Sequence, residues 1–397
     1  MSTRTVDRAT PIPIARPVVG EAELEAIRRP LLSGWLTQGP EVAGFEREFA
    51  EFVGAPHACA VSNCTTALHL ALRAAGVGPG DEVITVSHSF IATANAIRYC
   101  GGVPVFVDVH PDTYNIDPSG IAAAFSPKTR AILAVHQLGM PCDMAAIVDI
   151  ARRHGVPVIE DAACAAGSEI LCDGRWERIG WPHGDVACFS FHPRKVMTTG
   201  DGGMLTTTNP EWDRRFRLWR QHSMSVSDTA RHASSRVVIE EYTEIGFNYR
   251  MTDLQAAIGR VQLQRLRGMV DRRRELARQY HERLTALLGL RLPFEPAWAR
   301  SNWQSYCVRI PSGRDQSRVM QSMLDDGVAT RRGVMCAHLE PAYRQEPWRS
   351  GSGSDAALAH SERITGDGLM LPLYDGMTDD EQTRVVSSLE RALHTAP

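Results

Sequence analysis

One lysine stands between a short apolar run and a glycine-rich segment. Lys195 follows the apolar run 188–191 and precedes the glycine-rich residues 200–203. Because an ammonium group is costly to bury unless it is paired or neutralised, lysine is uncommon so close to a buried strand. Such a lysine is either the solvated end of a strand or an amine that forms a Schiff base. The second role requires a lowered pKa and a carbonyl partner.

A second motif favours the Schiff base. Residues 156–163 form a short apolar run that ends in Glu160 and Asp161 and continues with small residues. This pattern predicts a parallel strand with Asp161 at its carboxyl end, where open α/β sheets bind ligands. A lysine for an aldehyde and an aspartate for a ring nitrogen are what pyridoxal 5'-phosphate (PLP) requires of a protein. Taken alone, Asp161 would be a helix N-cap; together with Lys195 it predicts a PLP site.

Residues 60–70 combine the end of a strand, a small polar turn and the start of a helix. A helix N-terminus binds anions because its first N–H groups are unpaired and its dipole favours negative charge. Thr65 and Thr66 are therefore candidate phosphate contacts, with a plain polar N-cap as the alternative. After the next predicted strand, Phe90 offers a planar face for a cofactor ring, although a lone aromatic is more often part of a core.

Asn248 and Arg250 precede a long predicted helix. Asn248 can donate to a phosphate, and Arg250 can pair with an anion. The alternative interpretation is the capped start of that helix, with Thr252 or Asp253 at the cap.

The composition excludes several classes of function. The 397 residues indicate two domains or one large domain with an appendage. A formal net charge of −3 gives no electrostatic case for binding nucleic acid or an acidic membrane. No apolar run is long enough to span a bilayer and residues 1–8 lack a signal-peptide core, so we expect a cytoplasmic protein. The nine cysteines show no metal-ligand spacing, so we expect reduced thiols and no metal.

Short apolar runs alternate with helical stretches through the first half of the chain. This alternation predicts an α/β fold with a doubly wound, mostly parallel sheet. Residues 250–283 predict a long helix, without the sustained heptads of a coiled coil. The helix would join a large domain, residues 1–265, to a smaller α+β domain, residues 266–397. We predict strands at 82–86, 103–107, 131–135, 157–159, 185–191, 203–207 and 306–310, and further helices at 65–75, 144–154 and 379–393.

Together these segments resemble the DegT/DnrJ/StrS family, the PLP-dependent sugar aminotransferases of fold type I. The resemblance runs from about residue 13 to residue 393. It rests on segments that are specific only as a set, namely 33–40, 160–163, 189–195, 200–203 and 248–253. It implies a fold type I PLP-dependent transferase with a large sheet domain and a smaller C-terminal α+β domain.

The resemblance also implies a role for each matched residue. Lys195 would be the Schiff-base lysine and proton carrier, Asp161 would pair with the pyridine nitrogen, and Phe90 would stack on the ring. The implied phosphate contacts are Thr65, Thr66, Ser190 and, from the neighbouring subunit, Asn248, so the active unit would be a homodimer. The implied substrate contacts are Trp35, Arg250 and His338.

The chain departs from the family pattern around the cofactor. Cys64 replaces a glycine, and Cys164 replaces the glutamine or histidine that contacts the cofactor's ring oxygen. A thiol is a weak hydrogen-bond donor, so the second replacement changes that contact. Ser87 and His88 replace a proline–aromatic pair, and residues 334–335 replace an aromatic stretch before His338.

The expected function is transfer of an amino group from glutamate or glutamine to a keto-sugar, often nucleotide-linked, or to a keto-cyclitol, in two half reactions with ping-pong kinetics. One alternative is a PLP-dependent sugar dehydratase or lyase; Lys195 argues against it, because the dehydratases of this family carry histidine there. Another is a non-catalytic regulator on the same fold, which Lys195 and Asp161 together disfavour.

Overall fold

The computed structural model describes residues 10–227, 231–232, 234–353 and 358–395. Within these ranges the largest element is an eight-stranded sheet with the order β1-β9-β8-β5-β4-β2-β3-β13. Strands β13, β3, β2, β4, β5 and β8 run parallel, whereas β9 is antiparallel to both of its neighbours. The expected mostly parallel α/β sheet is confirmed. Its strands are β1 (His57–Val61), β2 (Glu82–Val86), β3 (Val103–Val107), β4 (Thr129–Val135), β5 (Val158–Asp161), β8 (Val186–Ser190), β9 (Gly203–Thr207) and β13 (Arg349–Ser350).

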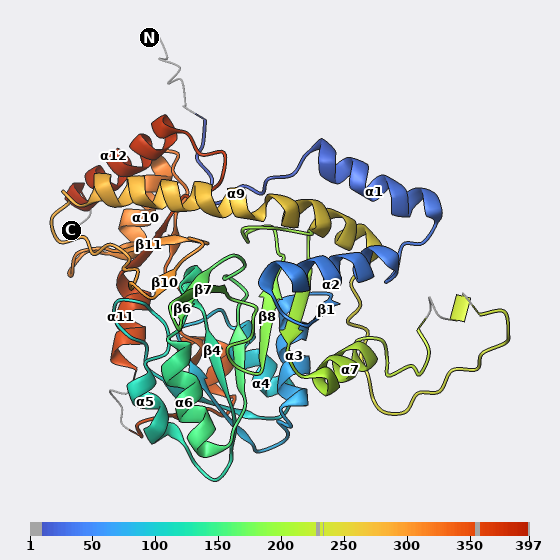
Figure 1. Ribbon diagram of the computed structural model, residues 1–397. Coiled ribbons are helices and arrows are strands. Elements are labelled where there is room, and N and C mark those ends of the chain that lie inside the picture. Colours follow the sequence, from blue (N-terminus) through green and yellow to red (C-terminus); the bar gives the residue numbers. More distant parts are fainter. Residues whose placement is uncertain (1–9, 228–230, 233, 354–357, 396–397) are drawn as a thin grey trace.

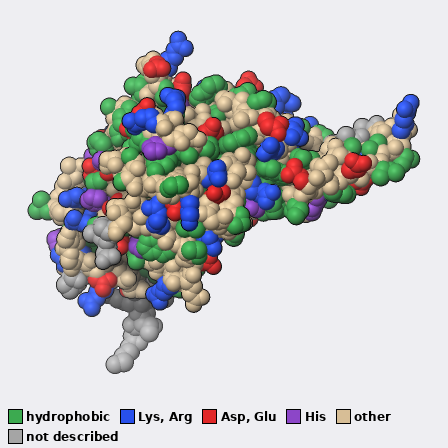
Figure 2. Space-filling model, turned by 90° about the horizontal axis from the view of Figure 1, so that it is seen from below, with side chains coloured by type: hydrophobic (Ala, Val, Ile, Leu, Met, Phe, Trp, Pro, Cys, Tyr) green, Lys and Arg blue, Asp and Glu red, His purple; other side chains and the backbone are tan. Residues whose placement is uncertain are grey.

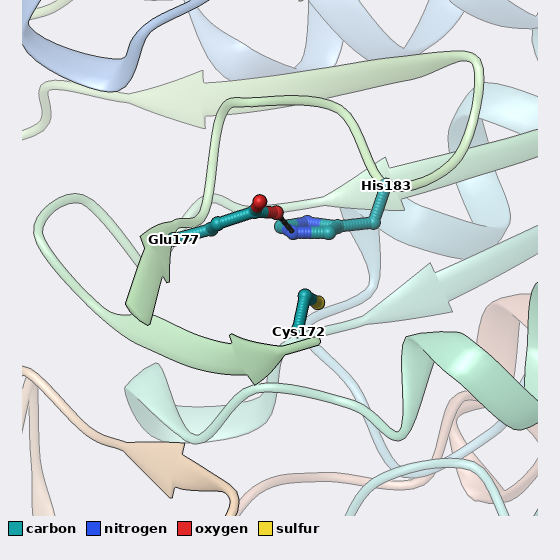
Figure 3. A group of neighbouring side chains, drawn as sticks. All are labelled: Cys172, Glu177 and His183. Carbon is teal, nitrogen blue, oxygen red and sulfur yellow. Dashed lines mark hydrogen bonds and ion pairs between the residues drawn. The ribbon is translucent and has the colours of Figure 1, made fainter. Parts of the chain in front are cut away.

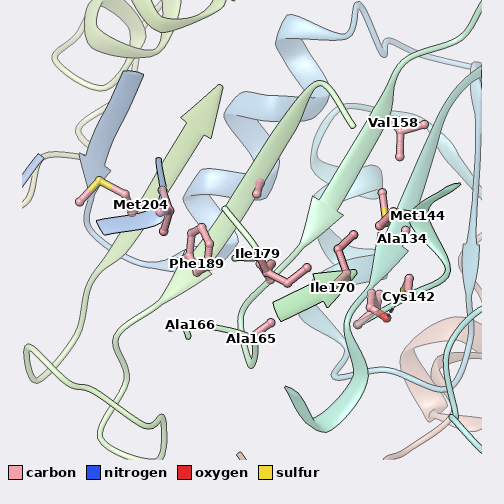
Figure 4. Packing of buried hydrophobic residues seen from close by; sticks show 14 of the residues in the cluster. Ala134, Cys142, Met144, Val158, Ala165, Ala166, Ile170, Ile179, Phe189 and Met204 are labelled. Carbon is pink, nitrogen blue, oxygen red and sulfur yellow. Dashed lines mark hydrogen bonds between the residues drawn. The ribbon is translucent and has the colours of Figure 1, made fainter. Parts of the chain in front are cut away.

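Helices cover both faces of this sheet (Figure 1). Successive residues of a strand point to opposite faces, so Ile132 and Ala134 join one apolar cluster and Ala131 and Leu133 join another. Figure 4 shows part of the first cluster, in which Phe189 and Met204 of neighbouring strands pack together with Ile179. The first face is covered by α2 (Pro40–Val53), α5 (Pro118–Ala124) and α6 (Met144–His154), and the second by α3 (Cys64–Ala74), α4 (Ala92–Tyr99) and α7 (Pro210–Trp219).

Two smaller sheets accompany the large one. The hairpin of β6 (Glu169–Cys172) and β7 (Arg175–Arg178) pairs with β10 (Ala299–Arg300). The second small sheet consists of β11 (Tyr306–Arg309), β14 (Gly368–Leu371) and β12 (Arg331–Arg332). The remaining helices of this part of the chain are α10 (Gln316–Asp325), α11 (Ala359–Asp367) and α12 (Asp379–Thr395), with the short 3-10 helices η2 (Ala337–Leu339) and η3 (Pro341–Arg344). A further 3-10 helix, η1 (Gln137–Gly139), follows β4 in the large sheet.

A single helix connects two apolar cores. Helix α9 (Asp253–Leu284) has 32 residues and begins at the N-cap Thr252, whose side chain accepts a hydrogen bond from the Gln255 N–H. Leu266 packs into the core beneath the large sheet, whereas Tyr280 packs into the core around β11 and β14. Helix α9 crosses the molecule beside α1 (Glu21–Ser33) and α2 (Figure 1). The division of the chain at residues 265 and 266 stays a prediction.

The segment between α7 and α9 projects from the body of the molecule, to the right in Figures 1 and 2. It carries the strongly exposed apolar residues Val237, Ile239, Tyr242 and Ile245. Apolar groups gathered on one projection indicate a surface that binds another molecule. Among the described residues, no helix combines the length and the apolar character that a bilayer crossing needs.

Candidate active site

The register of the large sheet brings the predicted phosphate segment next to the predicted lysine segment. Gly203, the first residue of β9, pairs with Val61 in β1 and with Ser190 in β8. A Cβ atom at this position would lie 2.5 Å from the carbonyl carbon of Asn63, so only glycine permits this approach. One strand further along the sheet, Asp161 pairs with Cys188. The turn before α3, Ser190 and Asp161 therefore meet at one edge of the sheet.

Lys195 lies in the loop that connects β8 to β9. This loop is closed by backbone hydrogen bonds from Thr199 N–H to Phe191 C=O (3.0 Å) and from Phe191 N–H to Gly202 C=O (2.9 Å). The half-buried Lys195 Nζ donates to Cys164 Sγ over 3.0 Å. The fold thus directs the amine back over the end of β5, where Cys164 follows Asp161 by one short turn.

The electrostatics of Lys195 differ from the sequence-based expectation of a lowered pKa. Burial does oppose the ammonium form. The hydrogen bond to Cys164 and the charge of Asp161 outweigh burial, however, and raise the pKa of Lys195 above its usual value. In the chain alone, the site therefore stabilises a protonated lysine.

Asp161 and the residue before it face opposite sides of the sheet and have different tasks. Asp161 is 5% exposed and accepts hydrogen bonds from Thr93 Oγ1 (2.8 Å) and Ala163 N–H (3.2 Å). Burial raises the pKa of Asp161, against the lowering effect of those hydrogen bonds and of Lys195. Glu160 instead contacts His136 Nε2 (3.0 Å) and accepts from Gly184 N–H (2.7 Å), which makes it part of the core.

The sequence argument missed Thr93 as a site residue. Its hydroxyl donates to Asp161 and contacts Ser89 Oγ at 2.8 Å, so it fixes the carboxylate from the first turn of α4. A hydroxyl in the first turn of the helix after a parallel strand was a usable signal, because that turn lies at the ligand-binding edge of such a sheet.

The N-terminus of α3 has the properties of an anion site. Asn63 caps the helix by accepting from Thr66 N–H at 3.0 Å. Thr66 Oγ1 donates to the Asn63 carbonyl at 2.7 Å, whereas the partly exposed Thr65 hydroxyl makes no hydrogen bond within the described part of the chain. The first turn of α3 lies at the edge where Ser190 ends β8, because Gly203 approaches Asn63 closely and pairs with Ser190. This position suits a phosphate group.

Phe90, in the turn after β2, and His338, on η2, flank this edge. The Phe90 ring is 64% exposed, and the Phe90 carbonyl accepts from the N–H of Thr93, the residue that contacts Asp161. A ring in this position offers an open face to a planar group. His338 lies on η2, where its Nδ1 contacts the buried Ser87 Oγ at 2.6 Å and its Nε2 contacts Glu362 Oε1 at 3.2 Å. Ser87, one of the departures from the family pattern, thus orients His338.

Three predicted site residues lie apart from this group in the single chain. Trp35 donates from Nε1 to the Gln38 carbonyl and packs edge-on against His232 of the projecting segment. Asn248 is exposed, and Arg250 is partly buried. The backbone of the segment that carries Asn248 and Arg250 nevertheless adjoins the phosphate turn, because the Tyr249 carbonyl accepts from Ser62 N–H at 2.8 Å.

The assembled groups fit pyridoxal phosphate. Lys195 supplies an amine, Asp161 a buried carboxylate for the ring nitrogen, Phe90 an open aromatic face, and the α3 N-terminus an anion site. Cys164 stands beside the amine and offers it a thiol, a weak hydrogen-bonding group. Buried Cys64 donates to the Cys188 carbonyl at 3.6 Å, and burial followed by Asp161 raises the pKa of Cys64 well above its usual value, so this thiol stays neutral.

Comparison with known proteins gives consistent matches over nearly the whole chain. The model of the DegT/DnrJ/EryC1/StrS aminotransferase family matches residues 17–390. The spore coat polysaccharide biosynthesis protein SpsC of Bacillus subtilis (strain 168) is 38% identical over 382 residues, which cover 95% of this chain and 96% of SpsC.

Two solved structures extend this similarity to the fold. The aminotransferase TlmJ from Streptoalloteichus hindustanus superposes with a TM-score of 0.86 at 36% identity, covering 96% of this chain and 99% of TlmJ. DesV from S. venezuelae, determined in complex with a ketimine intermediate, gives a TM-score of 0.86 at 32% identity, covering 98% of this chain and 100% of DesV. The expected fold type I architecture is confirmed.

An Asp161→Asn variant can distinguish the role of the carboxylate in the reaction from its effect on the stability of the fold. We expect Asp161→Asn to fold normally and to lose turnover by on the order of 100-fold or more, because an amide cannot keep a ring nitrogen protonated. Burial raises the pKa of Asp161, so the folded chain binds this proton more tightly than the unfolded chain does. The ionised group therefore costs stability once the pH rises above its unfolded pKa.

Calorimetry of the cofactor-free proteins at neutral pH should accordingly show Asp161→Asn melting at or above the wild-type temperature. Turnover close to the wild-type value would show that Asp161 is only a structural cap.

Proposed function

We propose that this chain, which belongs to the DegT/DnrJ/EryC1/StrS aminotransferase family, uses PLP to move an amino group from glutamate or glutamine to a keto-sugar or keto-cyclitol. The acceptor sugar would often be nucleotide-linked. The observation that carries this proposal is the half-buried Lys195 amine beside Cys164, at the same sheet edge as the Asp161 carboxylate and the α3 N-terminus. The polysaccharide-biosynthesis name of SpsC supports a sugar acceptor.

When bound, PLP supplies an aldehyde that takes up amines and an electron-poor ring that stabilises negative charge on the α-carbon of the donor. Lys195 Nζ would hold the cofactor at rest. Once free, the same nitrogen would remove the proton from the donor's α-carbon and act as the general base and acid of both half reactions. The carboxylate of Asp161, oriented by Thr93, would keep a proton on the ring nitrogen.

Other residues would bind and orient. Thr65, Thr66 and Ser190 would hold the phosphate, and Phe90 would lie against the ring. Cys164 would contact the ring oxygen while orienting Lys195 Nζ, which it already contacts. His338, oriented by Ser87, would contact the acceptor together with Trp35 and Arg250. We further propose that the enzyme acts in the cytoplasm without nucleic acid or membrane partners.

We also propose a homodimer in which each active site uses both chains. The exposed apolar residues of the projecting segment, Val237, Ile239 and Ile245 among them, would be buried against the second copy. Asn248 leads out of this segment and would reach the phosphate bound by the partner.

The lysine assignment can be tested sharply, because the chain contains only two lysines, Lys128 and Lys195. Lys195→Ala should abolish both transamination and covalent attachment of the cofactor. Exposed Lys128 provides a matched control, and Lys128→Arg should leave both unchanged. Borohydride reduction of the holoenzyme followed by peptide mapping should label Lys195. A label on Lys128, or retained activity in Lys195→Ala, would refute the assignment.

The amino donor and the class of acceptor can be read from the visible spectrum. Adding glutamate or glutamine to the holoenzyme should remove the absorbance of the lysine-bound cofactor, and an amino sugar or aminocyclitol should do the same in the reverse direction. Lys195→Ala serves as the blank. A holoenzyme whose spectrum is unchanged by donors and amino sugars alike would instead be a sensor.

The shared site predicts complementation between two defective chains. In a heterodimer of Lys195→Ala and Asn248→Ala, one of the two sites would contain both intact residues, so activity should return in part. Loss of the Asn248 hydrogen bond to a charged phosphate is expected to cost about 1.5–3 kcal/mol. If Asn248 bound the phosphate of its own chain, verified heterodimers would regain no activity. A fully active protein that light scattering shows to be a monomer would also refute the proposal.

A further inference from the structure

The β6–β7 hairpin presents two potential metal ligands on one face, away from the active site. Its turn consists of Asp173 and Gly174 with φ of 48° and 77°, the left-handed pair that two-residue hairpins favour. The register pairs Cys172 with Arg175 and Ile170 with Glu177, so Cys172 and Glu177 share a face. The short turn fixes their spacing.

A third potential ligand comes from the loop between β7 and β8. This loop is anchored by the hydrogen bonds from Gly184 N–H to Glu160 Oε1 (2.7 Å) and from Val158 N–H to Asp185 Oδ2 (2.8 Å). The anchored loop holds His183 over the hairpin, where its Nε2 lies 3.1 Å from Glu177 Oε2 (Figure 3). Cys172, Glu177 and His183 each bring a ligand atom within 4.8 Å of the others.

The buried His183 ring is not committed to the core by hydrogen bonds on both of its nitrogens. The His183 side chain is 9% exposed, and its buried Nδ1 has no hydrogen-bond partner within the described part of the structure. Cys172 is a free, partly exposed thiol. Glu177 places a carboxylate 3.1 Å from His183, and a negative charge there attracts a cation. Arg175 on the same face is exposed, and water screens its charge.

We propose that Cys172, Glu177 and His183 form a zinc site, with water as the fourth ligand. A thiolate, an imidazole and a carboxylate are the ligand types that zinc takes, in tetrahedral geometry. Zinc–ligand bonds of this kind place neighbouring ligand atoms about 3.3–3.8 Å apart. The contact between His183 and Glu177 is already near this range, so binding requires only a small movement of Cys172.

The ion would join the hairpin to the loop that leads into β8. That strand ends at Ser190 and continues into the Lys195 loop. The zinc ion would therefore stabilise a segment that positions the active site and would take no part in the reaction. The cysteine spacing led us to expect no metal, because spacings of five and six residues between these three ligands match no common metal motif. The site depends on the hairpin register.

The test uses the holoenzyme with Zn²⁺ alone and with Co²⁺ as a spectroscopic probe. Equilibrium dialysis should show one Zn²⁺ bound per chain, and Co²⁺ should give the visible bands of a tetrahedral site together with a thiolate charge-transfer band. Because zinc would bind only the folded chain at this site, Zn²⁺ should also raise the melting temperature.

Cys172→Ser and His183→Gln should each weaken zinc binding by more than about tenfold. Loss of a residue that only hydrogen-bonds to a metal ligand already costs about that much, so loss of a ligand should cost more. Cys100→Ser, which alters another partly exposed cysteine outside the cluster, should bind as the wild type does. The absence of stoichiometric binding, or equal affinity in Cys172→Ser and wild type, would overturn the proposal. Activity of the loaded enzyme does not enter the test, so the proposed aminotransferase function and the zinc site can fail separately.

Discussion

The antiparallel insertion of β9 between β1 and β8 is the constraint on which the candidate site depends. Gly203 pairs with strands on both sides and comes so close to Asn63 that a side chain would collide. This contact sets the phosphate turn, Ser190 and the lysine loop at one edge although they are distant in the chain. The parallel pairing of β5 with β8 then adds Asp161 to the same edge.

The side chains around Lys195 are thiols and one carboxyl group. Burial keeps Cys64 and Cys188 as neutral thiols by raising the pKa of each well above the usual value. Asp161 is a carboxylate near the amine, and Cys164 Sγ accepts the hydrogen bond that the amine donates. A small polarisable thiol in this position leaves more room beside the amine than an amide or imidazole would.

Local patterns predicted the regular elements well. The strands at 82–86, 103–107 and 203–207 and the helix at 144–154 have the predicted limits, because each is a buried apolar run or a helix with clear ends. The placement of Lys195 and Asp161 at one edge of the sheet also followed from chain order in an α/β sheet. The antiparallel β9, the β6–β7 hairpin and the role of Thr93 did not follow, because each depends on which strands become neighbours. No periodicity in one segment contains that information.

The first described residues complete the small core, although the rest of that core comes from the far end of the chain. Ile12 exchanges backbone hydrogen bonds of 2.9 Å with Gly327 and Ala329, and Thr10 accepts from Arg384, which lies 374 residues further along the sequence. During synthesis this segment is made long before the residues with which it pairs. The small core can therefore close only after residues 327–329 have been made, and a change in either of these two segments would open the same core. Residues 10–12 are thus made early but stabilised late, once their partners near residues 327, 329 and 384 exist.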